Sequence, residues 1–235
     1  DQTTGSGTPA ALGGATGGFV SGPGYQVMYV EPGGLSEGPV GNAAFSGLAL
    51  SAFTGDGALP YQQGMASCAG CSNDGVIGWG RWTNGDYLFE GSPIALNDKQ
   101  GLHYVVGIPT ASMPTGSASY TLIGATAPTD SSGGWAPGVL TSASFSANFD
   151  AATVSAGISV GIGGYSMTLS GSGTVGGNTF SATISGNAGD CATGCSGTLF
   201  GGFYGDAAAR AGFAYSFVNS GYGKTIDGAA AFAKQ

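Results

Sequence analysis

The cysteines are the residues whose type and spacing promise the most definite chemistry. Cys68 and Cys71 stand in the segment CAGC, and Cys191 and Cys195 stand in CATGC. In an oxidising compartment each pair would close a small loop, although four cysteines allow three connectivities. Two close pairs of thiolates can also bind zinc, but the C-x3-C spacing and the composition favour disulfides. We therefore predict the disulfides Cys68–Cys71 and Cys191–Cys195, with no metal and no cofactor.

Side chains that could catalyse a reaction are few. The segment GISVG matches G-x-S-x-G, but Ser159 lies in an alternating strand pattern and lacks the strand-turn-helix setting of a nucleophile. His103 is the only histidine, so a Ser–His–acid site would have to use it. In the strand-like segment LHYVVG, a hydrogen-bonded structural role explains this histidine better than a general base does. We expect the protein not to be an enzyme.

Four residues are candidate ligand contacts. Trp79 and Trp82 flank Arg81 in GWGRW, and their rings could stack on a sugar, although packing in a core is the commoner role for tryptophan. His103 is the fourth candidate, and haem binding through it is the alternative to a structural role.

The composition restricts the class of partner. Glycine accounts for 48 of 235 residues, and charged residues make up 8%, against roughly 25% in an average domain. The net charge is −8 with only five lysines and arginines, which argues against nucleic acid and anionic membranes as partners. No apolar run is long enough for a transmembrane helix. The first residues, DQTTGSGTP, indicate that either a targeting segment was removed or the chain was trimmed, and we expect an extracellular or outer-cell-surface location with the targeting segment removed.

The pattern along the chain divides it into three parts. Residues 1–22 are a Gly/Ser/Thr-rich extension, and residues 23–101 read as short strands between glycine, proline and asparagine turns. From residue 102 to residue 235 the pattern becomes regular. Apolar residues there alternate with serine, threonine and glycine, as in SASFSANF and VSAGISVGI, which is typical of half-buried antiparallel strands.

The regular part predicts an all-β fold built on an eight-stranded antiparallel up-and-down β-barrel. Short connections make neighbours in sequence neighbours in space, and closure removes exposed edges. A β-sandwich is the alternative, as is an outer-membrane barrel with its apolar face outward. The expected strands lie near residues 117–124, 140–149, 153–162, 164–171, 178–186, 196–205, 211–218 and 225–233.

Short glycine-based motifs in this part resemble a known family. The segment GFYGDAAARAGFAYSF, followed by IDGAAAFA, is similar to the last strands of the transferrin-binding-protein-B-like barrel. The segments GWGRW and HYVVGIPT resemble those preceding such barrels in FecR-like bacterial proteins. The resemblance covers about residues 102–235. It implies a cell-surface or periplasmic protein of a Gram-negative bacterium that binds a ligand, often in iron or haem acquisition.

Two functions are compatible with these observations. The first is a self-assembling subunit of a filament or surface layer, because flat walls of Ser, Thr and Gly lose little charge solvation when they pack on copies of themselves. In that hypothesis Ala10, Leu12, Phe19 and Val20 would dock on a neighbouring subunit. The alternative is a binding module for an iron- or haem-carrying or other host ligand. It predicts a loop cluster richer in aromatic or charged residues than the barrel walls.

Overall fold

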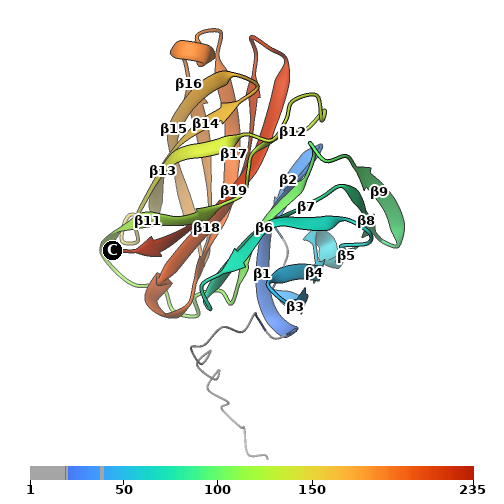
Figure 1. Cartoon of the computed structure of the whole chain (residues 1–235). Coiled ribbons are helices and arrows are strands. Elements are labelled where there is room, and N and C mark those ends of the chain that lie inside the picture. The colour runs from blue at the N-terminus through green and yellow to red at the C-terminus, as the bar shows by residue number, and fades with distance from the viewer. Residues whose placement is uncertain (1–18, 20, 38–39) are drawn as a thin grey trace, which may run out of the picture.

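The computed structural model describes residues 19, 21–37 and 40–235, and the regular secondary structure of this part of the chain is almost entirely β-strand (Figure 1). Its helices are three 3-10 turns of three residues each: η1 (Asp56–Ala58), η2 (Gly189–Cys191) and η3 (Asp206–Ala208). None of the described helices is long and apolar enough to cross a membrane. The strands form two sheets, one from each half of the chain.

The C-terminal sheet closes into a barrel, which confirms the predicted eight-stranded up-and-down architecture. Its strands pair antiparallel in chain order, and β11 pairs with both β13 and β19, so the ring is complete. A short strand, β12 (Thr129–Asp130), pairs with β19 outside the ring. The strands of the ring are β11 (Ser117–Ala125), β13 (Val139–Asn148), β14 (Thr153–Ile162), β15 (Tyr165–Gly176), β16 (Thr179–Gly186), β17 (Cys195–Tyr204), β18 (Arg210–Asn219) and β19 (Lys224–Lys234).

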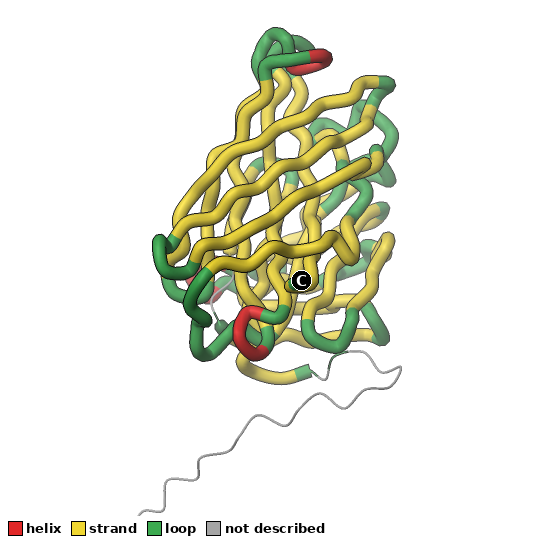
Figure 2. Tube along the Cα trace, turned by 90° about the vertical axis from the view of Figure 1, so that its left-hand side faces the viewer, coloured by secondary structure: helices red, strands yellow, loops and turns green. Residues whose placement is uncertain are grey.

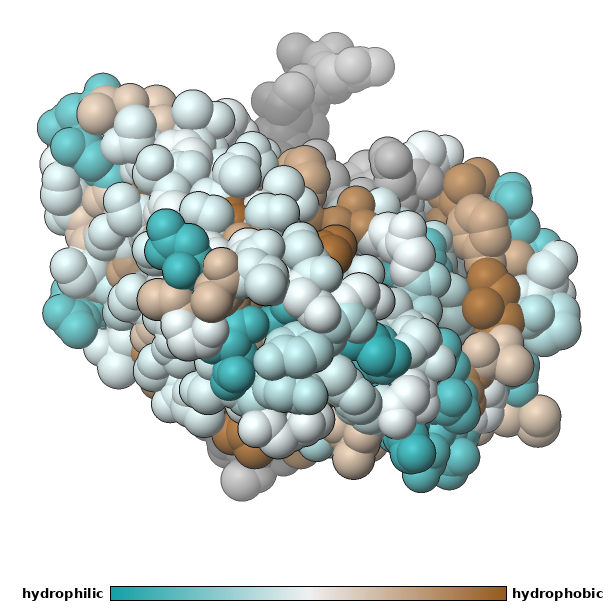
Figure 3. All heavy atoms as spheres, turned by 90° about the horizontal axis from the view of Figure 1, so that it is seen from above, coloured by the Kyte–Doolittle hydropathy of each residue, from teal (hydrophilic) through white to brown (hydrophobic). Residues whose placement is uncertain are grey.

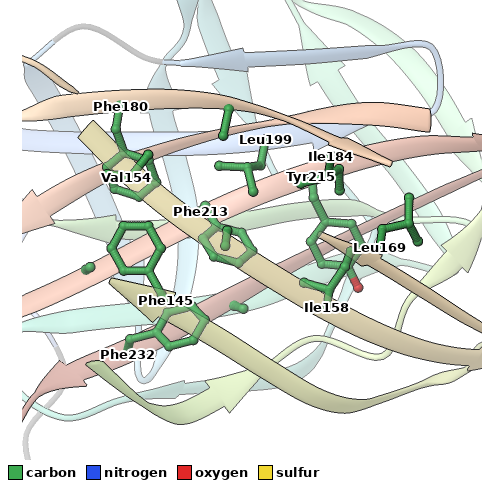
Figure 4. Packing of buried hydrophobic residues seen from close by; sticks show 14 of the residues in the cluster. Phe145, Val154, Ile158, Leu169, Phe180, Ile184, Leu199, Phe213, Tyr215 and Phe232 are labelled. Atoms are coloured by element: carbon green, nitrogen blue, oxygen red, sulfur yellow. The ribbon is translucent and has the colours of Figure 1, made fainter. Parts of the chain in front are cut away.

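The barrel interior holds the apolar half of each alternating strand. Phe145 stacks on Phe180 at a ring-centroid distance of 4.7 Å, and Ile158 and Ile184 are buried farther along the same interior, near Leu169 and Tyr215 (Figure 4). The serines and threonines between them point outward, and the strands cross the wall at a tilt (Figure 2). This arrangement is the reverse of a polar lumen inside an apolar wall, and the closed ring excludes the sandwich.

The N-terminal half forms a second sheet of ten strands. The longest, β1, pairs with β10, β2 and β3, and Leu102–Gly107 belongs to this sheet as β10, so the barrel begins at Ser117 rather than at residue 102. The strands are β1 (Gly22–Glu31), β2 (Gly34–Glu37), β3 (Gly41–Ser46), β4 (Ala49–Thr54), β5 (Pro60–Gln62), β6 (Ser67–Asn73), β7 (Ile77–Thr83), β8 (Gly85–Phe89), β9 (Ser92–Leu96) and β10. One face of this sheet buries a cluster of aromatic rings. The members include Tyr29, Phe53, Tyr61, Trp82, Tyr87 and Tyr104.

The N-terminal sheet packs against the outer wall of the barrel. A third buried cluster joins Met28, Ile77, Trp79 and Val105 of the first sheet to Tyr204, Ala229 and Ala231 of the barrel. Glycines make the close approach possible. A Cβ at Gly124 would collide with the ring of Trp79, and one at Gly212 would lie 2.6 Å from Ile77.

This packing explains the glycine- and alanine-rich sequence of the last strands. Residues of β18 and β19 are buried on both faces, one by the barrel core and the other by the N-terminal sheet. The part of the wall with the smallest side chains is therefore covered by the protein's own first half.

Candidate binding surface at one end of the barrel

Four connections meet at one end of the barrel. They are the segment between β12 and β13, the β14–β15 turn, the β16–β17 loop and the β18–β19 turn. In Figure 1 they lie at the top, and Figure 3 looks down on that end. Most of the surface seen there is of intermediate hydropathy, and strongly hydrophilic residues form separate groups within it.

Three aromatic side chains in or next to these connections contact one another: Tyr165 and Tyr222 are stacked, and Trp135 is tilted against Tyr165. The ring of Tyr165 lies 3.9 Å from that of Tyr222 and 5.3 Å from that of Trp135, centroid to centroid. Trp135 and Tyr165 are half-buried, and Tyr222 is 39% exposed. We call these three residues the aromatic cluster. Rings that are packed on one side and open to solvent on the other lose little conformational entropy on binding, which is why such residues anchor interfaces.

A buried carboxylate holds the loop that carries Trp135. Asp130 accepts hydrogen bonds from the backbone N–H groups of Ser132 (3.0 Å) and Gly134 (3.1 Å), and forms an ion pair with Lys224 at 2.8 Å. Burial alone would raise the pKa of Asp130, but the hydrogen bonds from Lys224 and Ser132 outweigh it and the pKa is lowered. Asp130 therefore stays ionised and fixes the turn before the tryptophan.

Lys224 links this anchor to the aromatic cluster. Its Nζ lies 5.4 Å from the centroid of the Trp135 ring, a cation–π distance, while it pairs with Asp130. One lysine thus orients both the acidic turn and the indole above it.

A second carboxylate, that of Asp227, lies beneath the same loop in surroundings that disfavour its charged form. Asp227 is 1% exposed and accepts a hydrogen bond from the Ser131 hydroxyl. Burial and the neighbouring charge of Asp130 raise the pKa of Asp227 to about 6, although hydrogen bonds from Ser131 and Ser216 act in the opposite direction. The loop is therefore supported by one carboxylate that is stabilised in its charged form and one that is not.

The β16–β17 loop adds a covalent anchor. Cys191 and Cys195 form a disulfide and are buried. Next to it, Asp190 accepts a hydrogen bond from the backbone N–H of Ser166 (2.6 Å), and its carbonyl accepts one from the side chain of Asn219 (2.9 Å). These contacts tie the loop to the residues that precede and follow the two tyrosines.

Beside the aromatic cluster is an open depression of about 540 Å³. Its lining includes Trp135, Pro137, Val139, Ile162 and Tyr165, interspersed with glycines. Val139 is 62% exposed. Apolar surface with few charged groups suits contact with another protein better than capture of a small ion.

The four residues predicted as ligand contacts lie in the interior. Trp82 donates a hydrogen bond from Nε1 to the carbonyl of Leu50 (2.7 Å), and Trp79 packs between the two sheets. Arg81 is 6% exposed. Since Trp82 and His103 have no exposed surface, neither can touch a ligand from solvent.

His103 has the hydrogen-bonded structural environment that the sequence favoured. Its Nδ1 and Nε2 lie 2.8 Å from the hydroxyls of Thr126 and Thr129, respectively. Burial, and to a smaller extent the charge of Arg81, lowers the pKa of His103 well below its usual value. The imidazole is therefore neutral. It links β10 of the N-terminal sheet to Thr126 and Thr129, which lie in the connection between β11 and β13.

The predicted assembly segment is described only at Phe19. This ring is 7% exposed and packs on Tyr25 and Phe45 of its own chain, at centroid distances of 5.6 and 5.1 Å. The other three assembly residues, Ala10, Leu12 and Val20, lie outside the described residues.

The cysteines Cys68 and Cys71 are also bonded as predicted. Cys68 and Cys71 form a disulfide on β6, and both sulfurs contact the hydroxyl of Tyr104. Within the described residues no group of three or more His, Cys, Asp or Glu side chains could hold a metal ion.

The aromatic cluster was missed by sequence reasoning. Trp135 stands in a loop of serine and glycine, and Tyr222 stands in the turn NSGYGK, so neither follows a strand period. The available signal was a large ring in a glycine-rich connection, where no core position accounts for it.

No protein-family model matches the chain, and no curated protein matches it. Solved structures do. Transferrin binding protein B from Haemophilus parasuis, crystallised as a mutant, matches 90% of this chain at 16% identity with a TM-score of 0.53, over 44% of its own length. The isotype 1 transferrin binding protein B of serogroup B Neisseria meningitidis matches with the same TM-score at 14% identity, over 43% of its length.

The likeness extends beyond the barrel, because 90% of the chain is covered. The chain spans less than half the length of these proteins. At this identity the likeness is one of fold. Residues 117–234 form a transferrin-binding-protein-B-like β-barrel, preceded by a β-rich region that packs on it.

Proposed function

We propose that this protein is a non-enzymatic binding module at the cell surface, which captures a protein ligand through the aromatic cluster and the loops around it. The observation that carries the proposal is the placement of Trp135, Tyr165 and Tyr222. Their rings contact one another and are partly open to solvent, and Asp130 and Lys224 hold the loop that carries Trp135.

The contrast with the barrel walls supports this location. Outward positions on β14 and β15 are mainly Ser, Thr and Gly, and the wall of β18 and β19 is covered by the N-terminal sheet. Tyrosine and tryptophan are the residues that most often dominate interface energies. The loop end therefore has the enrichment that the binding hypothesis predicted.

The fold suggests the class of ligand. The proteins of matching fold are named for binding transferrin. We therefore take an iron-carrying host protein as the ligand class, and the two disulfides fit an oxidising compartment where such a protein is met.

The test is a binding measurement on the immobilised full chain with iron-loaded transferrin, iron-free transferrin and haemoglobin as probes. We expect saturable one-to-one binding of one of them. Trp135→Ala should weaken it by about 30-fold, because truncating an interface anchor costs on the order of 2 kcal/mol. Met65→Ala is the matched control, since Met65 is an 82% exposed apolar residue on the other half of the chain.

Two results would overturn the proposal. One is no binding of any of the three probes at 100-fold molar excess over the immobilised chain. The other is equal binding by the Trp135→Ala and Met65→Ala variants. Assembly into a filament is not part of the proposal, because Phe19 packs on its own chain.

A further inference from the structure

The barrel ring is closed by only a short stretch of pairing between its first two strands. β11 and β13 pair from Ser117↔Asn148 to Tyr120↔Phe145. Beyond that point, in the described part of the chain, residues 121–125 pair only with β19 and residues 139–144 pair only with β14. In Figure 1 the two strands separate toward the side of the barrel that carries β12. We call this divergence the open seam.

Side-chain burial shows that the open seam uncovers part of the core. Leu122, Ala125, Leu140 and Ala143 pack against the buried cluster of the barrel but are only partly buried themselves. The residues paired with them on the neighbouring strand β14 are fully buried. Leu140 pairs with Val160 and Ala143 pairs with Ile158, which are 0% and 1% exposed, respectively. The interior is therefore sealed by β14 and less completely sealed at the seam.

The rims of the open seam carry no charge. Residues 121–125 are TLIGA and residues 139–144 are VLTSAS, and the outward side chains Ile123 and Val139 are 36% and 62% exposed. A strand edge with unpaired N–H and C=O groups is a template for another strand. Native edges are usually blocked by charged residues or proline, and neither occurs in these two stretches.

We propose that the open seam binds an extended, uncharged segment of the protein ligand, which adds a strand along residues 139–144 of β13. Only an extended polypeptide supplies donors and acceptors at the spacing of this edge. Alternate side chains of the added strand would cover Leu140 and Ala143. Six residues of edge accommodate a segment of about 20 Å, at roughly 3.3 Å per residue.

The position of the open seam supports a protein ligand as its occupant. The loop that carries Trp135 leads directly into β13, so the edge is continuous with the aromatic cluster. This inference rests on the proposed function for the identity of the occupant, but strand addition is measurable without that ligand.

The probe is an end-capped eight-residue peptide that alternates valine and threonine. Hydrogen-exchange mass spectrometry of the full chain should show slowed exchange in residues 139–144 when the peptide is added. The same peptide with alternate backbone nitrogens methylated keeps its side chains but cannot pair along one edge, and it should bind at least tenfold more weakly.

Two variants test the same edge. Val139→Asp places a charge on the exposed rim without touching the core, and Leu140→Lys places one at the inner rim; each should weaken peptide binding at least tenfold. Ser155→Lys is the control, because Ser155 is exposed on β14 but paired on both sides, with Ser146 and Ser172. It should bind the peptide within twofold of the native chain.

Several outcomes would overturn strand addition by a ligand. They are equal binding of the methylated peptide, slowed exchange on β9 or β6 instead of β13, and a chain that dimerises through the seam. Protection of residues 139–144 in the free protein that disappears when residues 1–18 are deleted would assign the edge to the protein's own segment. Peptide binding without binding of transferrin or haemoglobin would separate this inference from the proposed function.

Discussion

Replacing Asp227 by asparagine should stabilise the protein at neutral pH, by an amount that depends on pH. The Asp227 carboxyl is 1% exposed and its pKa is raised to about 6 from an ordinary value of 3.8. A raised pKa means that the folded state binds the proton more tightly than the unfolded chain does. The contribution of the Asp227 carboxyl to the free energy of unfolding is therefore fully present below about pH 4, and it is lost as the pH rises to about 6.

The magnitude follows from the two pKa values. A difference of about 2 units, at about 1.4 kcal/mol per unit, gives about 3 kcal/mol of destabilisation above pH 6. Asparagine has the same shape and no charge, so Asp227→Asn should be more stable by up to this amount at pH 7. For a chain of this length that corresponds to a rise in Tm of roughly 6–12 °C.

The assay is urea denaturation of the native chain and the variant at pH 4, 5, 6 and 7. The difference in unfolding free energy should be small at pH 4 and should grow through pH 5 and 6. Asp130→Asn is the matched control, and its effect on the free energy of unfolding should have the opposite sign. Because the pKa of Asp130 is lowered, its loss should destabilise the protein at pH 7, and the deficit should shrink as pH falls through the folded pKa. A stability difference for Asp227→Asn that is the same at all four pH values would show that the Asp227 carboxyl does not titrate with a raised pKa.

Further predictions concern packing, the loop disulfide and the buried histidine. Gly124→Ala should cost about 1–3 kcal/mol because its Cβ meets Trp79, and less in a Trp79→Leu background, as measured by a double-mutant cycle in urea. Replacing Cys191 and Cys195 together by alanine should cost about 2 kcal/mol from loss of the five-residue loop constraint; unchanged stability would contradict this. The imidazole NMR signals of His103 should not titrate between pH 7 and pH 5.5, and titration near its ordinary pKa would contradict the buried neutral state.

The barrel could be predicted because each of its strands faces two unlike environments. In VSAGISVGI every second residue faces the core, so the strand limits expected at residues 153–162 coincide with β14. The disulfides could also be predicted, since pairs three and four residues apart have few other partners within reach.

The docking of the two halves could not be predicted in the same way. Strands β7 and β10 are buried along their whole length, so they carry no alternation to interpret. The glycines that admit Trp79 and Ile77 have the same appearance in the sequence as glycines in turns. For this reason His103 and Trp82 were candidate ligand contacts, although the packing of one sheet on the other encloses them.

The proposed binding site depends on residues in and next to loops, which have no sequence period. The stacked pair Tyr165 and Tyr222 are 57 residues apart in the sequence, and Trp135 and Tyr222 are 87 residues apart. They meet because the barrel brings the β14–β15 and β18–β19 turns to the same end. Only the three-dimensional fold shows that these rings form one surface.

Binding through the aromatic cluster can be tested by a hydrogen-exchange footprint of the full chain with saturating iron-loaded transferrin. We predict slowed exchange in residues 131–138, 163–165 and 220–224, around the aromatic cluster, with exchange in the outer wall of β14 and β15 unchanged. Unaltered exchange throughout the chain, or protection confined to that Ser- and Thr-rich wall, would contradict it.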